Sequence, residues 1–194
     1  MNKLASIFYI MEQGFPTLDV TILPRINPER ILTQVYRDLP NGWVVRCGEE
    51  PSYHASPEKP LPWAVAYEFD DLRIKVREIT RDVGSNYLVF IHPQRRMDRA
   101  GNLLITPTNV IIEGCYGPYM NLARLAAGRD NPQQSLYFKP GMLGVRKLEG
   151  TKVFTIEDLL QLRQVERNLI TNPNAPTSIE FSFDGTRIDI HDIN

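Results

Sequence analysis

The sequence predicts a soluble protein of mixed α and β structure, in which helices and short strands alternate along 194 residues. Three observations support this fold class. Apolar residues recur at helical spacing over residues 70–83 and 155–169, and short apolar runs such as residues 43–45 are typical of buried strands. The closing segment alternates apolar and polar residues on both sides of Asp184-Gly185, a hairpin turn pair.

The first half of the chain predicts three helices and four strands. Helix stops follow the first and third helices at Gly14 and Gly84, and Pro28 occupies a first helical position. Residues 47–62 are rich in proline and predict a long loop that is either functional or mobile. The expected helices cover residues 3–13, 28–36 and 70–83, and the expected strands cover residues 18–23, 43–45, 63–68 and 87–91.

The second half predicts shorter strands around one strong helix. That helix begins at Thr155, because Thr155 and Asp158 have the spacing of a capping box ahead of an apolar stripe. A weaker helix ends at Ala127, before Gly128. We expect one domain over residues 1–194, with a lobe boundary near residues 95–110. The expected strands cover residues 103–106, 110–113, 135–138 and 152–154, followed by the terminal hairpin.

Charge and composition exclude several classes of protein. The 22 basic and 23 acidic residues give a net charge of -1, so no global field attracts nucleic acid or an anionic membrane. Cys47 and Cys115 lack metal-binding spacing and predict buried, unreactive thiols in a reducing compartment. The sequence lacks an export signal and an apolar run of the roughly 20 residues that a membrane span needs. We therefore expect a cytoplasmic protein without a membrane or nucleic-acid partner.

The polar face of the terminal hairpin is a candidate metal site. If Asp184-Gly185 forms a two-residue turn, Glu180 lies opposite Asp189, and His191 lies diagonally on the same face. Facing carboxylates repel each other unless a cation lies between them. Oxygen ligands with an imidazole suit Mg²⁺ or Mn²⁺ accompanying a nucleotide phosphate. The alternative is a solvated sheet face whose charges a neighbouring arginine or lysine neutralises.

Two groups of cations are candidate phosphate ligands. Arg46 follows an apolar strand, where a guanidinium can hold phosphate by two hydrogen bonds, although a surface ion pair explains it equally well. The turn with Arg95, Arg96 and Arg99 either contacts phosphates or is a solvated charge run. His92 stands alone in the sequence and receives no role.

Several segments resemble one known family, and they occur in the same order. The most specific is Ser178-Ile179-Glu180-Phe181-Ser182-Phe183-Asp184-Gly185 with the strand after it, which resembles the motif "DIEWAxDG…LYILQ". Trp43-Val44-Val45-Arg46-Cys47 is similar to the "VRSS" strand of the same family. The remaining similar segments are residues 2–6, 14–16, 87–94, 100–106 and 110–117. Together they resemble a shortened ATP-grasp nucleotide-binding domain of the phosphoenolpyruvate synthase and pyruvate phosphate dikinase family.

This resemblance implies an α/β (α+β) fold of the ATP-grasp type, with mixed or antiparallel sheets flanked by helices in two small lobes. It implies binding of ATP with Mg²⁺ or Mn²⁺ by a metal-dependent phosphotransferase, whose acceptor is supplied in trans, for example by a protein partner. The implied phosphate and cofactor ligands are Lys3, Arg46 and Glu113, with Arg46 catalytic. The implied metal ligands are Glu180 and His191, which the hairpin pairing joins to Asp189.

Two other functions remain open. The first is a catalytically inactive ATP-grasp-like relative that serves as an interaction or structural module. The second is a nucleic-acid-binding module that uses the arginines of the basic turn, which the near-neutral charge disfavours.

Overall fold

The protein is described by a computed structural model that covers residues 3–50, 61–117, 130–142, 144–169 and 177–193. The chain divides into two compact units, and each is described by itself. Unit 1 comprises residues 1–8 and 18–95, and unit 2 comprises residues 9–17 and 96–194. The first helix, α1 (Lys3–Glu12), crosses this division after Phe8.

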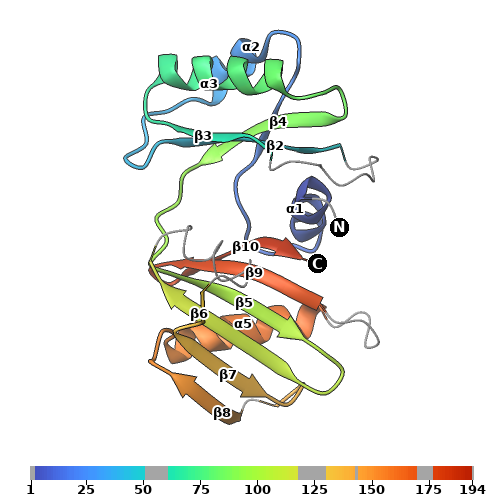
Figure 1. Ribbon diagram of the computed structural model, residues 1–194, viewed down its shortest axis with the longest axis vertical. Helices are drawn as coiled ribbons and strands as arrows, with labels where there is room; N and C mark the ends of the chain where they lie inside the picture. Colours follow the sequence, from blue (N-terminus) through green and yellow to red (C-terminus); the bar gives the residue numbers. More distant parts are fainter. Residues whose placement is uncertain (1–2, 51–60, 118–129, 143, 170–176, 194) are drawn as a thin grey trace. The chain divides into compact units, whose positions relative to one another are not determined.

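Unit 1 is a four-stranded antiparallel sheet in the order β1-β4-β2-β3, with two helices on one face (Figure 1). The stripe of α3 supplies Leu72, Val76 and Ile79 to a core that includes Val45 and Ile91 of the sheet. The strands are β1 (Thr21–Leu23), β2 (Trp43–Glu49), β3 (Trp63–Ala66) and β4 (Tyr87–Pro93), and the helices are α2 (Pro28–Val35) and α3 (Phe69–Asp82).

Unit 2 is a six-stranded antiparallel sheet in the order β10-β9-β5-β6-β7-β8, and α5 (Ile156–Leu169) packs on it (Figure 1). Phe181 and Phe183 of β9 meet Phe154 in the core, with ring centroids 5.6 and 6.2 Å from it. The strands are β5 (Arg99–Ile105), β6 (Val110–Tyr116), β7 (Gln134–Phe138), β8 (Val145–Gly150), β9 (Thr177–Asp184) and β10 (Arg187–Ile193).

The predicted fold class is confirmed, because two antiparallel sheets are flanked by helices. One predicted strand is wrong: residues 152–154 form no strand, and β8 lies just before them. Val153 and Phe154 are buried and apolar, but their amides donate to Gln134 Oε1 at 2.8 and 3.0 Å instead of pairing with a strand. β8 is exposed along its whole length, so it carries no apolar pattern for the sequence to reveal.

Other predicted strand boundaries differ from those in the structure, because the strands extend into segments that were predicted to be turns. β2 continues through Glu49, β5 begins at Arg99, and β6 continues through Tyr116. The middle of the proline-rich loop and the weak helix ending at Ala127 lie outside the described residues. Among the helices that the structure describes, none is both long and apolar enough to cross a membrane.

Candidate functional site

Unit 1 carries Arg46 on the sheet face opposite α2 and α3, where Leu4 and Ile7 of α1 pack against Phe90. Side chains alternate along a strand, and Val45 and Ile91 point into the core beneath the helices. Arg46 and His92, their neighbours on β2 and β4, therefore lie on the opposite face. The two strands pair so that Arg46 and His92 are diagonal neighbours, and Arg95 is close enough for its charge to act on His92. The structure thus places Arg46 beside an imidazole and a second arginine.

His92 is a buried, neutral hydrogen-bond acceptor. Its Nδ1 lies 2.9 Å from the carbonyl oxygen of Pro93, and a carbonyl can only accept, so Nδ1 carries the proton. Burial lowers the pKa of His92 to about 4, and the charges of Arg46 and Arg95 act in the same direction. Its Nε2 is buried and has no hydrogen-bond partner among the described residues. No local motif predicted this role, because the burial of His92 and its proximity to Arg46 of β2 depend on sheet pairing.

Unit 1 also contains Lys3 and Cys47, two residues considered in the sequence analysis. Lys3 begins α1, but its side chain lies outside the described residues. Cys47 is a free, buried thiol, and burial raises its pKa to about 11 despite the adjacent Arg46. A thiol with that pKa is protonated at neutral pH, so Cys47 is no nucleophile, as the sequence predicted.

Unit 2 carries a polar row on the sheet face that does not belong to the apolar core. Asn102 of β5 pairs with Glu113 of β6 on one side and with Glu180 of β9 on the other. Paired residues point to the same face, so two carboxylates flank one amide across three strands. The Oδ1 of Asn102 is buried without a partner in the described part of the chain. The sequence analysis did not identify Asn102 as a site residue. Asparagine is uncommon inside strands, and its presence in this apolar segment could have indicated a functional position.

The hairpin register differs from the prediction. Asp184 pairs with Arg187, so Gly185 and Thr186 form the turn in place of Asp184-Gly185. The backbone of Gly185 adopts φ 59, where glycine is favoured, and its amide donates to Asp98 Oδ2 at 3.0 Å. When a hairpin turn shifts by one residue, each residue of one strand pairs with a residue two positions further along the other strand. A shift of two positions leaves every side chain on the same face of the sheet. The predicted core face is therefore confirmed, with Phe181, Phe183, Ile188 and Ile190 all buried in the core of unit 2.

A β-bulge at His191 changes which acidic residues face each other. Asp189 lies opposite Ser182, and Glu180 lies opposite Asp192, so the predicted pairing of Glu180 with Asp189 is wrong. The extra residue of a bulge is invisible to a strict alternation pattern. The facing carboxylates of this hairpin are thus those of Glu180 and Asp192.

Asp189 and His191 are both engaged within the hairpin. Asp189 forms an ion pair with Arg187 at 3.3 Å, which agrees with the neutralisation that the alternative interpretation expected. Asp189 is only 1% exposed, however, so it is buried and not solvated. His191 Nε2 and Ser182 Oγ share a hydrogen bond of 2.7 Å. Within the described ranges, no group of three or more His, Cys, Asp or Glu side chains is arranged to hold a metal ion. The chemistry still suits Mg²⁺, which proteins commonly bind through one or two carboxylates together with ligand phosphates and water.

Two arginines of the basic turn and Gly114 of β6 have structural roles. Arg99 donates two hydrogen bonds of 2.7 Å to Asp158, and Arg96 pairs with Asp98 at 3.0 Å. A Cβ at Gly114 would lie 2.3 Å from the ring of Phe154, so this glycine allows close packing. Arg99 and Arg96 therefore neutralise nearby carboxylates in unit 2.

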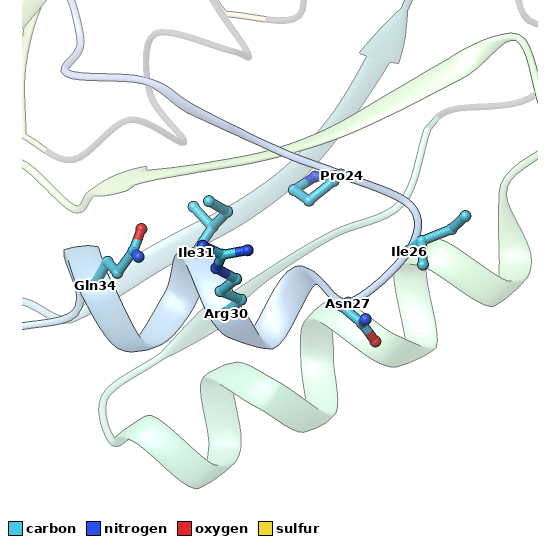
Figure 2. A pocket seen from close by; sticks show the side chains of 6 residues that line it. All are labelled: Pro24, Ile26, Asn27, Arg30, Ile31 and Gln34. Atoms are coloured by element: carbon cyan, nitrogen blue, oxygen red, sulfur yellow. The ribbon is translucent and has the colours of Figure 1, made fainter.

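A hollow of about 330 Å³ lies on unit 1 (Figure 2). Its lining comes from α2 and the segment before it, and includes none of the residues predicted to bind phosphate or metal. The lining residues are Pro24, Ile26, Asn27, Arg30, Ile31 and Gln34.

No protein-family model matches the chain, and no curated protein matches it in sequence. Solved structures do match. D-alanine–D-alanine ligase from Helicobacter pylori has a TM-score of 0.54 at 15% identity, over 100% of this chain and 50% of the ligase. Carboxyaminoimidazole ribonucleotide synthase from Aspergillus clavatus, complexed with ATP, has a TM-score of 0.54 at 8% identity, over 98% of this chain and 43% of the synthase.

An acetyl-coenzyme A synthetase from Ca. Korarchaeum cryptofilum matches over most of both chains. Its TM-score is 0.57 at 11% identity, over 100% of this chain and 91% of the synthetase chain. That structure contains coenzyme A, acetyl-coenzyme A and a phosphorylated phosphohistidine segment. The matching structures are ATP-grasp folds, and this chain has the same fold while spanning about half the length of the ligases that it matches.

Proposed function

We propose that this chain binds an adenine nucleotide together with a divalent metal ion and transfers a phosphoryl group to an acceptor supplied in trans. The observation that carries the proposal is the face of the unit 1 sheet opposite α2 and α3, where Arg46 lies beside the buried His92 in a chain with the ATP-grasp fold. Phosphoryl transfer depends mainly on positioning and on cations around the phosphates, which is the chemistry that these residues offer.

In unit 1 the proposed phosphate ligands are Arg46, as the catalytic cation, and Lys3. Arg46 suits this role because guanidinium groups form paired hydrogen bonds with phosphate oxygens. Arg95 adds positive charge to the same surroundings. The Nε2 of His92 offers an acceptor to an amino or hydroxyl group of the ligand, and the low pKa of this imidazole keeps it neutral there.

In unit 2 the proposed metal ligands are Glu180 and His191, with Asp189 nearby. Asp192 joins this set because it faces Glu180 across the hairpin. Glu113 is the proposed nucleotide ligand, and Asn102 lies between it and Glu180. When bound, the metal ion would neutralise phosphate charge, and the carboxylates would orient it.

Two solved neighbours support the proposal. One was determined with ATP, and another with a phosphorylated phosphohistidine segment. A histidine-bearing protein segment that becomes phosphorylated is the kind of acceptor that a partner in trans would supply. Assignment to the phosphoenolpyruvate synthase family remains part of the proposal and rests on the sequence motifs.

The test is titration calorimetry of ATP, with and without Mg²⁺, on the unmodified protein and on Arg46→Ala and Glu180→Ala. We expect each substitution to weaken MgATP binding at least tenfold, because each removes a charged contact contributing about 1.5–3 kcal/mol. Glu180→Ala should also reduce the dependence on Mg²⁺. Arg81→Ala and Glu157→Ala are matched controls, since both side chains are exposed on helices and should leave the affinity unchanged.

The same titration also tests the alternative function, an inactive ATP-grasp-like module. If the unmodified protein gives no heat with MgATP, the chain is an ATP-grasp-like module without nucleotide function, which is the alternative. Phosphorus NMR of MgATP with the protein then tests turnover. Release of γ-phosphate that Arg46→Ala abolishes would support phosphoryl transfer.

A further inference from the structure

The two edges of the sheet in unit 2 differ in how they are protected. At β10, residues Pro16 and Thr17 cover part of the edge: Ile190 N donates to Pro16 O at 2.9 Å, and Thr17 Oγ1 donates to Ile190 O at 2.8 Å. At the opposite edge, β8 is the outermost described strand, and all six of its residues are exposed (Figure 1). The edge strands of unit 1, β1 and β3, have only three and four residues. A long open edge presents unpaired backbone groups to another strand.

Exposed apolar side chains gather at this same edge. Leu148 is 59% exposed, Val145 is 46% exposed, and Met142 in the preceding turn is 55% exposed. Leu148 pairs with Leu136 of β7, which is buried in the core, so Leu148 lies on the apolar face of the sheet. This face therefore continues to the edge without a partner among the described residues.

The charges on β8 are already arranged in complementary fashion. Lys147 Nζ lies 2.6 Å from Glu149 Oε1, and both residues share a face with Tyr137 of β7. Lysine on an edge strand normally discourages pairing. Here Lys147 is followed two residues later by Glu149, so in a pair of antiparallel copies each lysine can lie opposite the glutamate of the other copy.

Symmetry limits how β8 can pair with a copy of itself. A two-fold axis perpendicular to the sheet keeps every side chain on its own face, so the axis must pass beside one central residue. If the two-fold axis passes beside Arg146, Lys147 or Glu149, that residue lies opposite the same residue of the second copy, and their like charges repel. Centring on Leu148 places the two copies of Leu148 together, each Lys147 opposite the other chain's Glu149, and each Arg146 opposite Gly150.

We propose that β8 (Val145–Gly150) is a self-association edge, which pairs antiparallel with β8 of a second copy of this chain about an axis at Leu148. The pairing would continue one sheet across two molecules and cover Leu148. Its area is that of a strand edge, smaller than a standard interface, so association depends on concentration. This proposal is independent of nucleotide binding.

The test is sedimentation velocity of the full chain over a wide range of concentrations, with Lys147→Glu and Glu149→Lys. The unmodified protein should show a monomer–dimer equilibrium. Each single variant should weaken it by roughly tenfold, because two symmetry-related charge pairs change from attraction to repulsion. An equimolar mixture of the two variants should regain dimer, since one chain then carries two acidic residues on this face of β8 and the other carries two basic residues. The double variant should regain it as well.

Arg81→Glu, on the exposed surface of α3, is the charge-matched control and should associate like the unmodified protein. Circular dichroism of each variant checks that the fold is retained. A monomer at every concentration, or a mixture that associates no better than its two components, would overturn the proposal.

Discussion

The guanidinium of Arg99 binds the carboxylate of Asp158 through two hydrogen bonds of 2.7 Å, from Nε to Oδ2 and from the terminal nitrogen to Oδ1. Arg99 begins β5, and Asp158 caps α5 by accepting from Thr155 N at 2.8 Å. Arg99 also donates to the carbonyl of Gly185 at 2.7 Å. One arginine therefore connects a strand, the start of a helix and the hairpin turn of unit 2.

We expect Arg99→Ala to lower the free energy of unfolding by about 3 kcal/mol, because it leaves a buried carboxylate without its cation. Asp158 is only 1% exposed, so water cannot replace the lost partner. Burial raises the pKa of Asp158, but the hydrogen bonds from Arg99 and Thr155 outweigh it, and the net pKa lies below its ordinary value. Urea unfolding followed by circular dichroism measures the change.

Arg96→Ala is the control for that measurement. Arg96 is three residues away, and its side chain is 75% exposed in an ion pair with Asp98. Exposed pairs contribute between zero and about 1 kcal/mol, so this variant should stay close to the unmodified protein. Equal effects of the two substitutions would contradict the structural role of Arg99.

We expect Gly114→Ala to destabilise the protein by about 2 kcal/mol, because the added methyl group meets a packed ring. Its Cβ would lie 2.3 Å from two carbon atoms of Phe154, which is buried. Gly144→Ala is the control, since a Cβ at that position meets nothing within 4 Å. Thermal unfolding of both variants distinguishes steric packing from a general effect of losing glycine. A Gly114→Ala protein as stable as the control would contradict this packing.

We expect His92 to make stability dependent on pH in mildly acidic solution. Its pKa falls from 6.5 to about 4 on burial, so between these values the unfolded chain binds a proton that the folded chain does not. The contribution is complete above pH 6.5 and is lost as pH decreases towards 4, by about 3 kcal/mol in total. His92→Gln should flatten the unfolding free energy over this range. Urea titrations at several pH values give both curves, and parallel curves would mean that His92 is not buried as a neutral group.

We expect the buried ion pair between Arg163 and Glu166 to be costly to break but replaceable as a pair. The two groups are 2.6 Å apart and are 3% and 0% exposed, and Arg163 also donates to the carbonyl of Met142 at 2.6 Å. Glu166→Leu alone should lower stability by about 3 kcal/mol, because a buried guanidinium loses its counter-charge. The double variant Arg163→Met with Glu166→Leu should be less destabilised than that single one. A double-mutant cycle by urea unfolding tests this, and strictly additive effects would argue against coupling.

The sequence alone determined the parts of this protein that depend on neighbouring residues. The spacing of Leu72, Val76 and Ile79 predicted α3, and the alternation around Phe181 predicted the buried face of the terminal hairpin. The Thr155 and Asp158 capping box was readable for the same reason, because both partners lie within one helical turn. Patterns of this kind reflect short-range geometry, which a linear sequence records directly.

Only the tertiary structure decided which distant residues meet. The bulge at His191 sets Asp192 opposite Glu180, and sheet pairing places Asn102 between Glu180 and Glu113. The surroundings of His92, the ion pair of Arg99 and the open edge at β8 depend on segments far apart in the chain. Their energies come from burial and from partners across strands, and those exist only after the topology has formed.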